Sequence, residues 1–191
     1  MKSITTQAAA VAATLLLSLT AAQAGDWSGN VSGMLGQKSL DDKDWPDADK
    51  QSSIGMLLDF KRTDWPVSIA IDLMGTGDEN KHGADKDEAY TAEMNIGLRK
   101  IFTVDGTSLR PYVGGGFASI YAESKSSTGG TTTTYDDTAS GGWVGAGAYY
   151  DLTPKFHLGL DARYSRAEVR LNGEDREAGG TNLAVSAGYH W

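Results

Sequence analysis

Seven charged residues lie within segments that otherwise alternate like strands, and together they carry both signs. They are Asp59, Asp72, Glu93, Arg99, Arg110, Asp161 and Arg163. Carboxylates beside guanidinium groups could pair with one another, conduct ions or exchange protons with a substrate. Because a buried charge without a partner is costly and both signs are available, the sequence favours a network of ion pairs, with His157 beside it.

The spacing of these charges also predicts how they pair. Glu93 and Arg99 are six residues apart in one segment, which is about 20 Å along a strand. Each should therefore find its partner on a neighbouring strand. The expected pairs are Arg99 with Asp59 or Asp161, and Glu93 with Arg163 or Arg110.

The three histidines, His82, His157 and His190, offer no catalytic set. Nucleophilic catalysis requires a serine beside a histidine that a carboxylate orients, and no such group is expected here. Ser165 and Glu168 lie near each other but without a histidine. The sequence therefore predicts a protein that is not an enzyme, with no catalytic residue and no cofactor.

Two polar stretches are rich in carboxylates, which are ligands that calcium and magnesium prefer. Their acidic residues are Asp41, Asp42, Asp44, Asp47 and Asp49, and then Asp78, Glu79, Asp85, Asp87 and Glu88. Neither stretch has the spacing of an EF-hand loop. We therefore predict no metal site, but a solvated acidic surface that could meet a surface ligand.

The elements that must position these residues are strands. In NLAVSAGYHW, residues 182–191, apolar side chains occupy every second position, which is the period of a strand with one apolar face. Similar alternation recurs in WSGNVSGML, SIGMLLDF, VSIAIDLM, AYTAEMNIGLR, RPYVGGGFASIY, GWVGAGAYYDL and KFHLGLDARYS. The parity of the fifth and sixth segments stays open because glycine occupies both faces. About eight strands result, each near the 9–11 residues that a tilted membrane strand needs.

The connections between these strands alternate between short and long. RTDWP, VDGT and LTPK are predicted tight turns, whereas the connections between them are long and polar, and the Thr131–Thr134 run has the composition of a solvating loop. The apolar face recurs in every strand, yet no helix or second sheet is available to cover it. We therefore predict an all-β fold, an eight-stranded antiparallel up-and-down transmembrane β-barrel over residues 25–191.

Aromatic side chains near the strand ends predict two interfacial belts. One would contain Trp27, Phe60, Trp65, Phe102, Tyr150, Phe156 and Trp191 at the end with short turns; the other would contain Tyr90, Tyr121, Trp143 and Tyr164 toward the long connections.

Residues 1–24 have the features of a secretory signal peptide. Lys2 gives a positive start, an apolar run covers Ala8–Leu19, and Ala22-Gln23-Ala24 is a small-x-small cleavage site. The chain contains no cysteine, so an exported domain must be stable without disulfides. With a net charge of −8 and no basic stripe, nucleic acid is not an expected partner.

Three segments carry a resemblance to a known family: RPYVGGGFA, GAGAYYDLTPKFHLGLDARYS and the final AVSAGYHW. The chain resembles the small eight-stranded outer-membrane barrels of Gram-negative bacteria, such as the OmpA transmembrane domain and the OmpX and OmpW groups. The resemblance implies an outer-membrane location, with lipid and lipopolysaccharide as surroundings. It also implies that the barrel-assembly machinery recognises the end of the last strand, where Tyr189 and Trp191 would form the assembly signal.

Two functions stay open at this point. The first is a closed, monomeric barrel that stabilises the envelope or presents loops for adhesion-like surface interaction. The second is a narrow channel for small or hydrophobic solutes, as a resemblance to the OmpW group implies. A lumen of eight strands is normally filled by side chains, which favours the closed barrel.

Overall fold

The structure, a computed structural model, describes residues 26–40, 43–45, 49–82, 85–128 and 131–191. The predicted signal peptide, residues 1–24, lies outside the described residues. The same is true of Asp41, Asp42 and Asp47 in the first acidic stretch.

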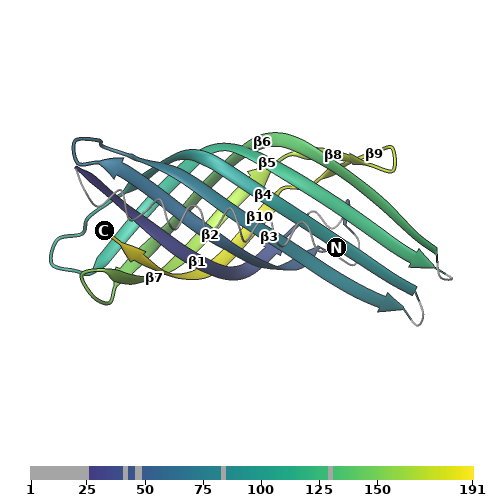
Figure 1. Ribbon diagram of the computed structural model, residues 1–191, viewed down its shortest axis with the longest axis horizontal. Helices are drawn as coiled ribbons and strands as arrows, with labels where there is room; N and C mark the ends of the chain where they lie inside the picture. The colour runs from purple at the N-terminus through teal and green to yellow at the C-terminus, as the bar shows by residue number, and fades with distance from the viewer. Residues whose placement is uncertain (1–25, 41–42, 46–48, 83–84, 129–130) are drawn as a thin grey trace.

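The described residues form ten strands, eight of which close into an antiparallel barrel (Figure 1). Their bounds are β1 Trp27–Ser39, β2 Lys50–Arg62, β3 Ser68–His82, β4 Asp85–Ile101, β5 Leu109–Thr128, β6 Thr131–Asp151, β7 Phe156–Arg166, β8 Glu168–Leu171, β9 Glu174–Glu177 and β10 Gly180–His190. The order around the barrel is β1-β10-β7-β6-β5-β4-β3-β2, and β8 pairs with β9 in a separate hairpin. The predicted fold class is confirmed.

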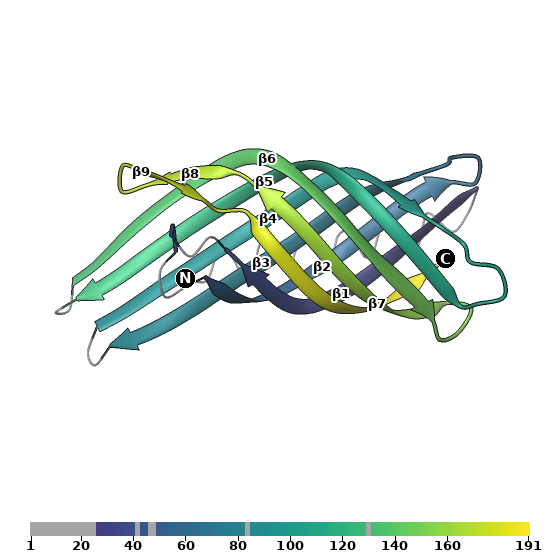
Figure 2. The same cartoon turned by 180° about the vertical axis from the view of Figure 1, so that it is seen from behind.

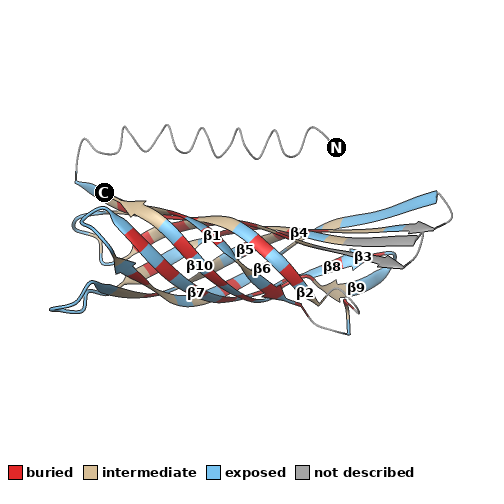
Figure 3. Ribbon diagram, turned by 90° about the horizontal axis from the view of Figure 1, so that it is seen from below, coloured by how far each residue is buried: buried red, intermediate tan, exposed pale blue. Residues whose placement is uncertain are grey.

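Buried and exposed residues alternate along the strands (Figure 3), and the buried ones are largely polar whereas many of the exposed ones are apolar. In β7, every second residue from His157 to Ser165 is buried and the residues between are exposed. Leu160 is 65% exposed, whereas the next residue, Asp161, is 4% exposed. No helix long and apolar enough to cross a membrane is present in the part of the chain that the structure describes.

The barrel closes between its first and last strands. β1 pairs with β10 from Asn30↔His190 to Ser39↔Thr181. Just beyond this ladder, Gly29 N donates to Trp191 O at 3.3 Å and Trp191 N donates to Gly29 O at 3.1 Å. Closure removes the free edges that would otherwise invite aggregation.

The two ends of the barrel differ, as Figure 2 shows. At the short-turn end, tight connections join β2 to β3, β4 to β5 and β6 to β7. In the β4–β5 turn, Gly106 has a φ of 75°, a conformation that glycine adopts without strain. At the opposite end, which we call the hairpin end, β3–β4 and β5–β6 extend beyond the other strands.

The prediction of long polar loops at these two connections was wrong. The β3–β4 ladder continues to His82↔Asp85, and the β5–β6 ladder to Thr128↔Thr131. The Thr131–Thr134 run therefore belongs to β6. Threonine is β-branched and suits a strand, and the continuing ladder supplies the backbone hydrogen bonds that a loop would take from water.

The barrel interior as candidate functional site

One continuous set of ion pairs, which we call the central network, fills the middle of the interior. Arg99 donates from Nη2 to Asp72 Oδ2 at 2.7 Å and from Nη1 to Asp59 Oδ2 at 3.2 Å. Arg163 donates from Nη1 to Asp72 Oδ2 at 3.0 Å and from Nε to Asp161 Oδ1 at 2.8 Å. All five residues are buried. Asp72 therefore links arginines from β4 and β7 across the lumen.

Neutral side chains add hydrogen bonds to the central network. Asn30 Nδ2 donates to Asp59 Oδ1 at 2.7 Å, and the Tyr112 hydroxyl donates to Asp161 Oδ2 at 2.6 Å. The Arg99 guanidinium also lies 5.0 Å from the centre of the Tyr112 ring. Because the network holds three carboxylates and only two guanidinium groups, these neutral donors help to stabilise the extra negative charge.

A second buried ion pair lies closer to the hairpin end. Lys38 Nζ is 3.1 Å from Glu93 Oε2, and the same carboxylate accepts from Ser165 Oγ at 3.0 Å and from Asn95 Nδ2 at 2.8 Å. Lys38 also donates to Ala178 O at 2.9 Å. Every acceptor oxygen of Glu93 therefore has a partner.

The predicted partners were right for one residue and wrong for another. Arg99 contacts Asp59, as expected, whereas Glu93 pairs with Lys38 instead of Arg163 or Arg110. Alternation indicates which face of the sheet a residue occupies, but not its height along the lumen. Sequence reasoning missed Lys38, although it shares the inward parity of Asn30 and Ser32 in β1.

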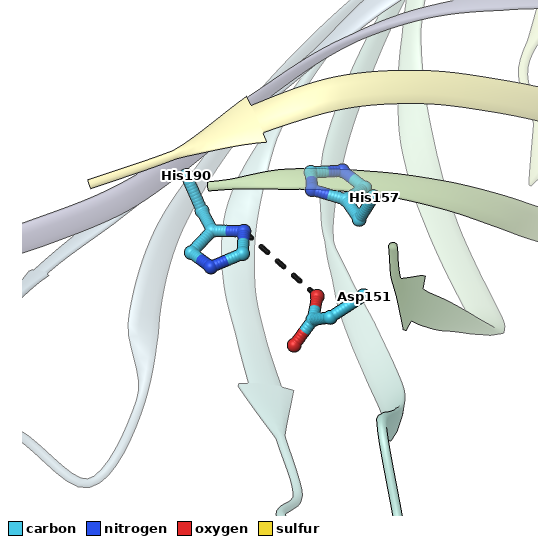
Figure 4. Close-up of side chains that lie close together, drawn as sticks. All are labelled: Asp151, His157 and His190. Carbon is cyan, nitrogen blue, oxygen red and sulfur yellow. Dashed lines mark ion pairs between the residues drawn. The ribbon is translucent and has the colours of Figure 1, made fainter. Parts of the chain in front are cut away.

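Arg110 belongs to a separate group at the short-turn end, which we call the mouth cluster: Arg110, Asp151, His157 and His190. Arg110 Nη2 donates to Asp151 Oδ1 at 2.8 Å and lies 3.2 Å from His190 Nδ1. Figure 4 shows Asp151 close to both histidines. Of the predicted charges, Arg110 alone thus lies outside the two buried ion-pair groups described above.

An apolar cluster lies in the interior toward the hairpin end, against β5 and β6. Val169 and Leu171 of β8 are each 1% exposed and belong to one buried cluster with Ile120 of β5. Trp45 joins the same cluster, and its Nε1 donates to Glu177 O at 2.7 Å. The β8–β9 hairpin thus covers the lumen with an apolar cap.

A carboxylate outside the closed barrel helps to hold this cap. Asp137 lies in the part of β6 that extends beyond the β7 ladder, which begins at Gly142↔Arg166. It accepts from Arg170 N at 2.7 Å and from Thr138 N at 2.8 Å. These two donors hold the pKa of the Asp137 carboxyl below its ordinary value. The charged form of Asp137 therefore anchors β8 to β6.

The structure corrects the placement of Trp143. This residue was expected in an aromatic belt, but it is 3% exposed and faces the interior. The Arg163 guanidinium lies 5.4 Å from the centre of its ring. Glycines at 141, 142 and 145 obscured the inward parity of β6.

One serine lies beside a histidine in the barrel interior, a contact that the sequence did not indicate. Ser32 Oγ is 2.8 Å from His157 Nε2, and Asp151 lies nearby. The arrangement still lacks two features of a hydrolytic triad. His157 Nδ1 has no hydrogen-bond partner in the described part of the chain, and Ser32 is 1% exposed. A nucleophile must be reachable by its substrate, and its base must be oriented.

The sequence profile of a family described as outer membrane protein beta-barrel domain matches residues 9–190. The chain belongs to this family. It is a β-barrel of the outer membrane, surrounded there by membrane lipid. No curated protein sequence matches the chain significantly.

Several solved structures share the fold at low sequence identity. Neisserial surface protein A is 16% identical with a TM-score of 0.55, and the match covers 87% of this chain and 96% of that one. Yersinia pestis Ail, solved with the heparin analogue sucrose octasulfate, is 14% identical with a TM-score of 0.54, covering 86% and 97%. Pseudomonas aeruginosa OprG is 11% identical with a TM-score of 0.59, covering 88% and 96%. At these identities the likeness concerns the fold alone.

Proposed function

We propose that this protein is a non-enzymatic outer-membrane barrel with a closed lumen. It stabilises the envelope and presents its hairpin end for adhesion-like surface interaction. The observation that supports a closed lumen is that three groups of side chains occupy it, one after another along its axis. The mouth cluster lies at one end, the central network with the Lys38–Glu93 pair in the middle, and the apolar cap at the other end.

The ion pairs and hydrogen bonds of these side chains indicate that they block the lumen. The carboxylates of Asp59, Asp161 and Glu93 each contact a cation and at least one neutral hydrogen-bond donor. An ion entering the lumen would have to replace these contacts while losing its own water. The barrier to conduction is therefore formed by charged side chains of the wall that already pair with one another.

We expect the refolded wild-type protein in a planar lipid bilayer to show no steady openings. The physical reason is that an eight-stranded lumen filled by side chains leaves no continuous water path. Single-channel recording at neutral pH measures this directly, with an established porin reconstituted in the same lipid as positive control. Steady openings of one defined size would reject the closed lumen and favour a narrow channel for small or hydrophobic solutes.

An apolar groove on the barrel bears on the channel alternative. A nearly apolar groove of about 850 Å³ runs along the outer wall, lined by residues that include Leu35, Leu160 and Val185. These side chains are strongly exposed on the face that meets lipid. Lipid acyl chains suit this groove, so we assign it to the lipid and lipopolysaccharide surroundings and not to transport.

The surface role rests on the shape of the hairpin end. The β2–β3 ladder ends at Ser52↔Gly77, whereas the β4–β5 ladder continues to Lys86↔Ser127. Strands β3 to β6 therefore rise beyond the barrel as one sheet. Residues 131–136 of β6 are all exposed and mostly threonine. This sheet forms a polar platform for a surface ligand.

Shortening this platform should abolish surface interaction without unfolding the barrel. In the proposed variant, Asn-Gly replaces residues 123–136 and joins the cross-strand pair Ala122↔Asp137 through a type I′ turn. We expect cells that produce this variant to attach to epithelial layers no better than cells without the protein, whereas wild type increases attachment.

The matched control replaces the four threonines of 131–134 with serines, which keeps the length and polarity of the platform. Both variants should retain the far-ultraviolet circular dichroism of a barrel. Attachment by the shortened variant at the wild-type level would show that the β5–β6 extension is not the interacting surface.

A further inference from the structure

The mouth cluster brings two imidazoles and one carboxylate together on a rigid part of the wall. Asp151 is the last residue of β6 and lies directly opposite His157 in the β6–β7 ladder. His157 in turn pairs with Gly188 of β10, two residues before His190 on the same inward face. His190 N donates to Lys155 O at 2.8 Å, which ties β10 to the β6–β7 turn. Three neighbouring strand ends thus fix the three side chains.

The spacing of their donor atoms suits a metal ion. One ligand atom from each of Asp151, His157 and His190 lies within 4.8 Å of the other two, and His190 Nδ1 is 3.8 Å from Asp151 Oδ1. Ligands of a tetrahedral zinc ion, each about 2.0–2.2 Å from the metal, lie roughly 3.3–3.6 Å apart. The side chains would need to close by at most roughly 1.5 Å, which small rotations provide.

His157 has the hydrogen bonding expected of a metal ligand. Its Nε2 contacts Ser32 Oγ at 2.8 Å, whereas its Nδ1 is buried and has no hydrogen-bond partner among the described residues. Histidines that bind metals usually donate their second ring N–H to a neighbouring oxygen, which fixes the tautomer. Ser32 can accept such a bond and leave the other nitrogen with a free lone pair.

A cation already occupies part of this cluster. The Arg110 guanidinium donates to Asp151 Oδ1 at 2.8 Å and 3.0 Å, and its Nη2 lies 3.2 Å from His190 Nδ1. Asp151 and His190 therefore both direct lone pairs at the positive charge of Arg110. Arg110 is one-fifth exposed at the mouth and also contacts Asn30 Oδ1 at 3.3 Å, so it has another partner when it leaves Asp151.

We propose that Asp151, His157 and His190 bind a divalent transition-metal ion at the short-turn mouth, in competition with Arg110. Two imidazoles and one carboxylate suit zinc and similar first-row ions better than calcium or magnesium, which prefer oxygen ligands alone. Three protein ligands leave a fourth position for water or an outside group. The partly exposed Asp151 and His190 give the ion access from the solvent at that end. Arg110 balances the charge of Asp151 while the site is empty.

Zinc chloride titrated into the refolded full barrel, prepared without a polyhistidine tag, tests the proposal by isothermal calorimetry. Wild type should bind one zinc ion. Asp151→Asn and His190→Ala should each weaken binding by more than the roughly 10–100-fold that loss of an outer hydrogen-bond partner costs. Arg110→Ala should bind zinc more tightly than wild type, because the competing cation is gone. His82→Ala changes the one histidine of the sequence that is not in the mouth cluster; it is the matched control and should bind like wild type.

Thermal unfolding gives an independent measurement on the same samples. Zinc should raise the midpoint of wild type and of His82→Ala, but not that of Asp151→Asn, because a ligand that binds only the folded state stabilises it. Circular dichroism confirms that each variant is folded. The site would be rejected by absence of saturable binding to wild type, by equal binding to the Asp151→Asn and His190→Ala variants, or by weaker binding to Arg110→Ala.

Discussion

Replacing Arg99 with methionine should lower the free energy of unfolding by about 3–5 kcal/mol, because it leaves buried carboxylates without their shared counter-charge. Arg99 is 1% exposed and contacts both Asp59 and Asp72. Without it, Asp59 loses its arginine, and Arg163 remains paired with Asp72 and Asp161. Urea unfolding of the barrel refolded into lipid vesicles, followed by tryptophan fluorescence, measures the change.

Two further variants separate this electrostatic effect from loss of packing. Arg62→Met removes an exposed pair with Asp64, 3.5 Å away, and should cost less than about 1 kcal/mol. Arg99→Met combined with Asp59→Asn removes one charge of each sign and should be more stable than Arg99→Met alone. If the double variant is as unstable as the single one, the energetic importance of Arg99 lies in its contacts with the Tyr112 ring and other neighbours, not in its charge.

The sequence predicted which face each strand presents because the strand period is strictly two. In β7, the alternation of Leu158 and Leu160 with Gly159 and Asp161 matches the alternation of exposed and buried residues. The same reasoning placed Asp59, Asp72 and Arg99 on the inward face, where the structure has them. A repeated apolar face without a covering layer was sufficient to predict a closed barrel in lipid.

Contacts across the lumen could not be predicted, because they depend on how far each strand is shifted along its neighbours. Glu93 and Lys38 lie on β4 and β1, which are not adjacent in the barrel, yet their charged groups are 3.1 Å apart. The shift of the strands sets the height of each residue, and parity carries no information about it. The same holds for the mouth cluster. Asp151, His157 and His190 all face inward, but only the register of β6, β7 and β10 brings them close together.

The β8–β9 hairpin had a local signal that was overlooked. Val169 and Leu171 alternate with charged residues and are followed by Asn172-Gly173. Asn-Gly between alternating segments is a strong indication of a type I′ turn, which needs positive φ at both central residues. The structure has φ values of 53° and 82° there. Only the destination of this hairpin, against the apolar cluster at the hairpin end of the barrel, required the fold.

Changing Trp191 to aspartate should greatly reduce the amount of folded protein in the outer membrane. Tyr189 and Trp191 stay the predicted assembly signal, on the outward face of the strand that closes the barrel with β1. The Trp191 ring covers Gly29, where an added Cβ would lie 2.6 Å from it. Trp191→Phe should keep normal levels because it preserves a large aromatic ring on that face. Surface labelling of intact cells, together with the amount of protein in outer-membrane fractions, measures the effect.

The amount of folded protein lost from the outer membrane distinguishes recognition by the assembly machinery from the cost of placing a charge in lipid. A charge on the lipid face of a barrel costs only about 0–1 kcal/mol near the interface, compared with about 2–4 kcal/mol at the midplane. Trp27→Asp is the matched control, since Trp27 also lies outward at the short-turn end and is 38% exposed. Refolding from urea into vesicles, without assembly machinery, should be nearly as efficient for both aspartate variants as for wild type. In cells, only Trp191→Asp should fail, because, of these two residues, only Trp191 belongs to the predicted assembly signal. Equal loss for Trp27→Asp would assign both tryptophans to the interfacial belt and reject the assembly signal.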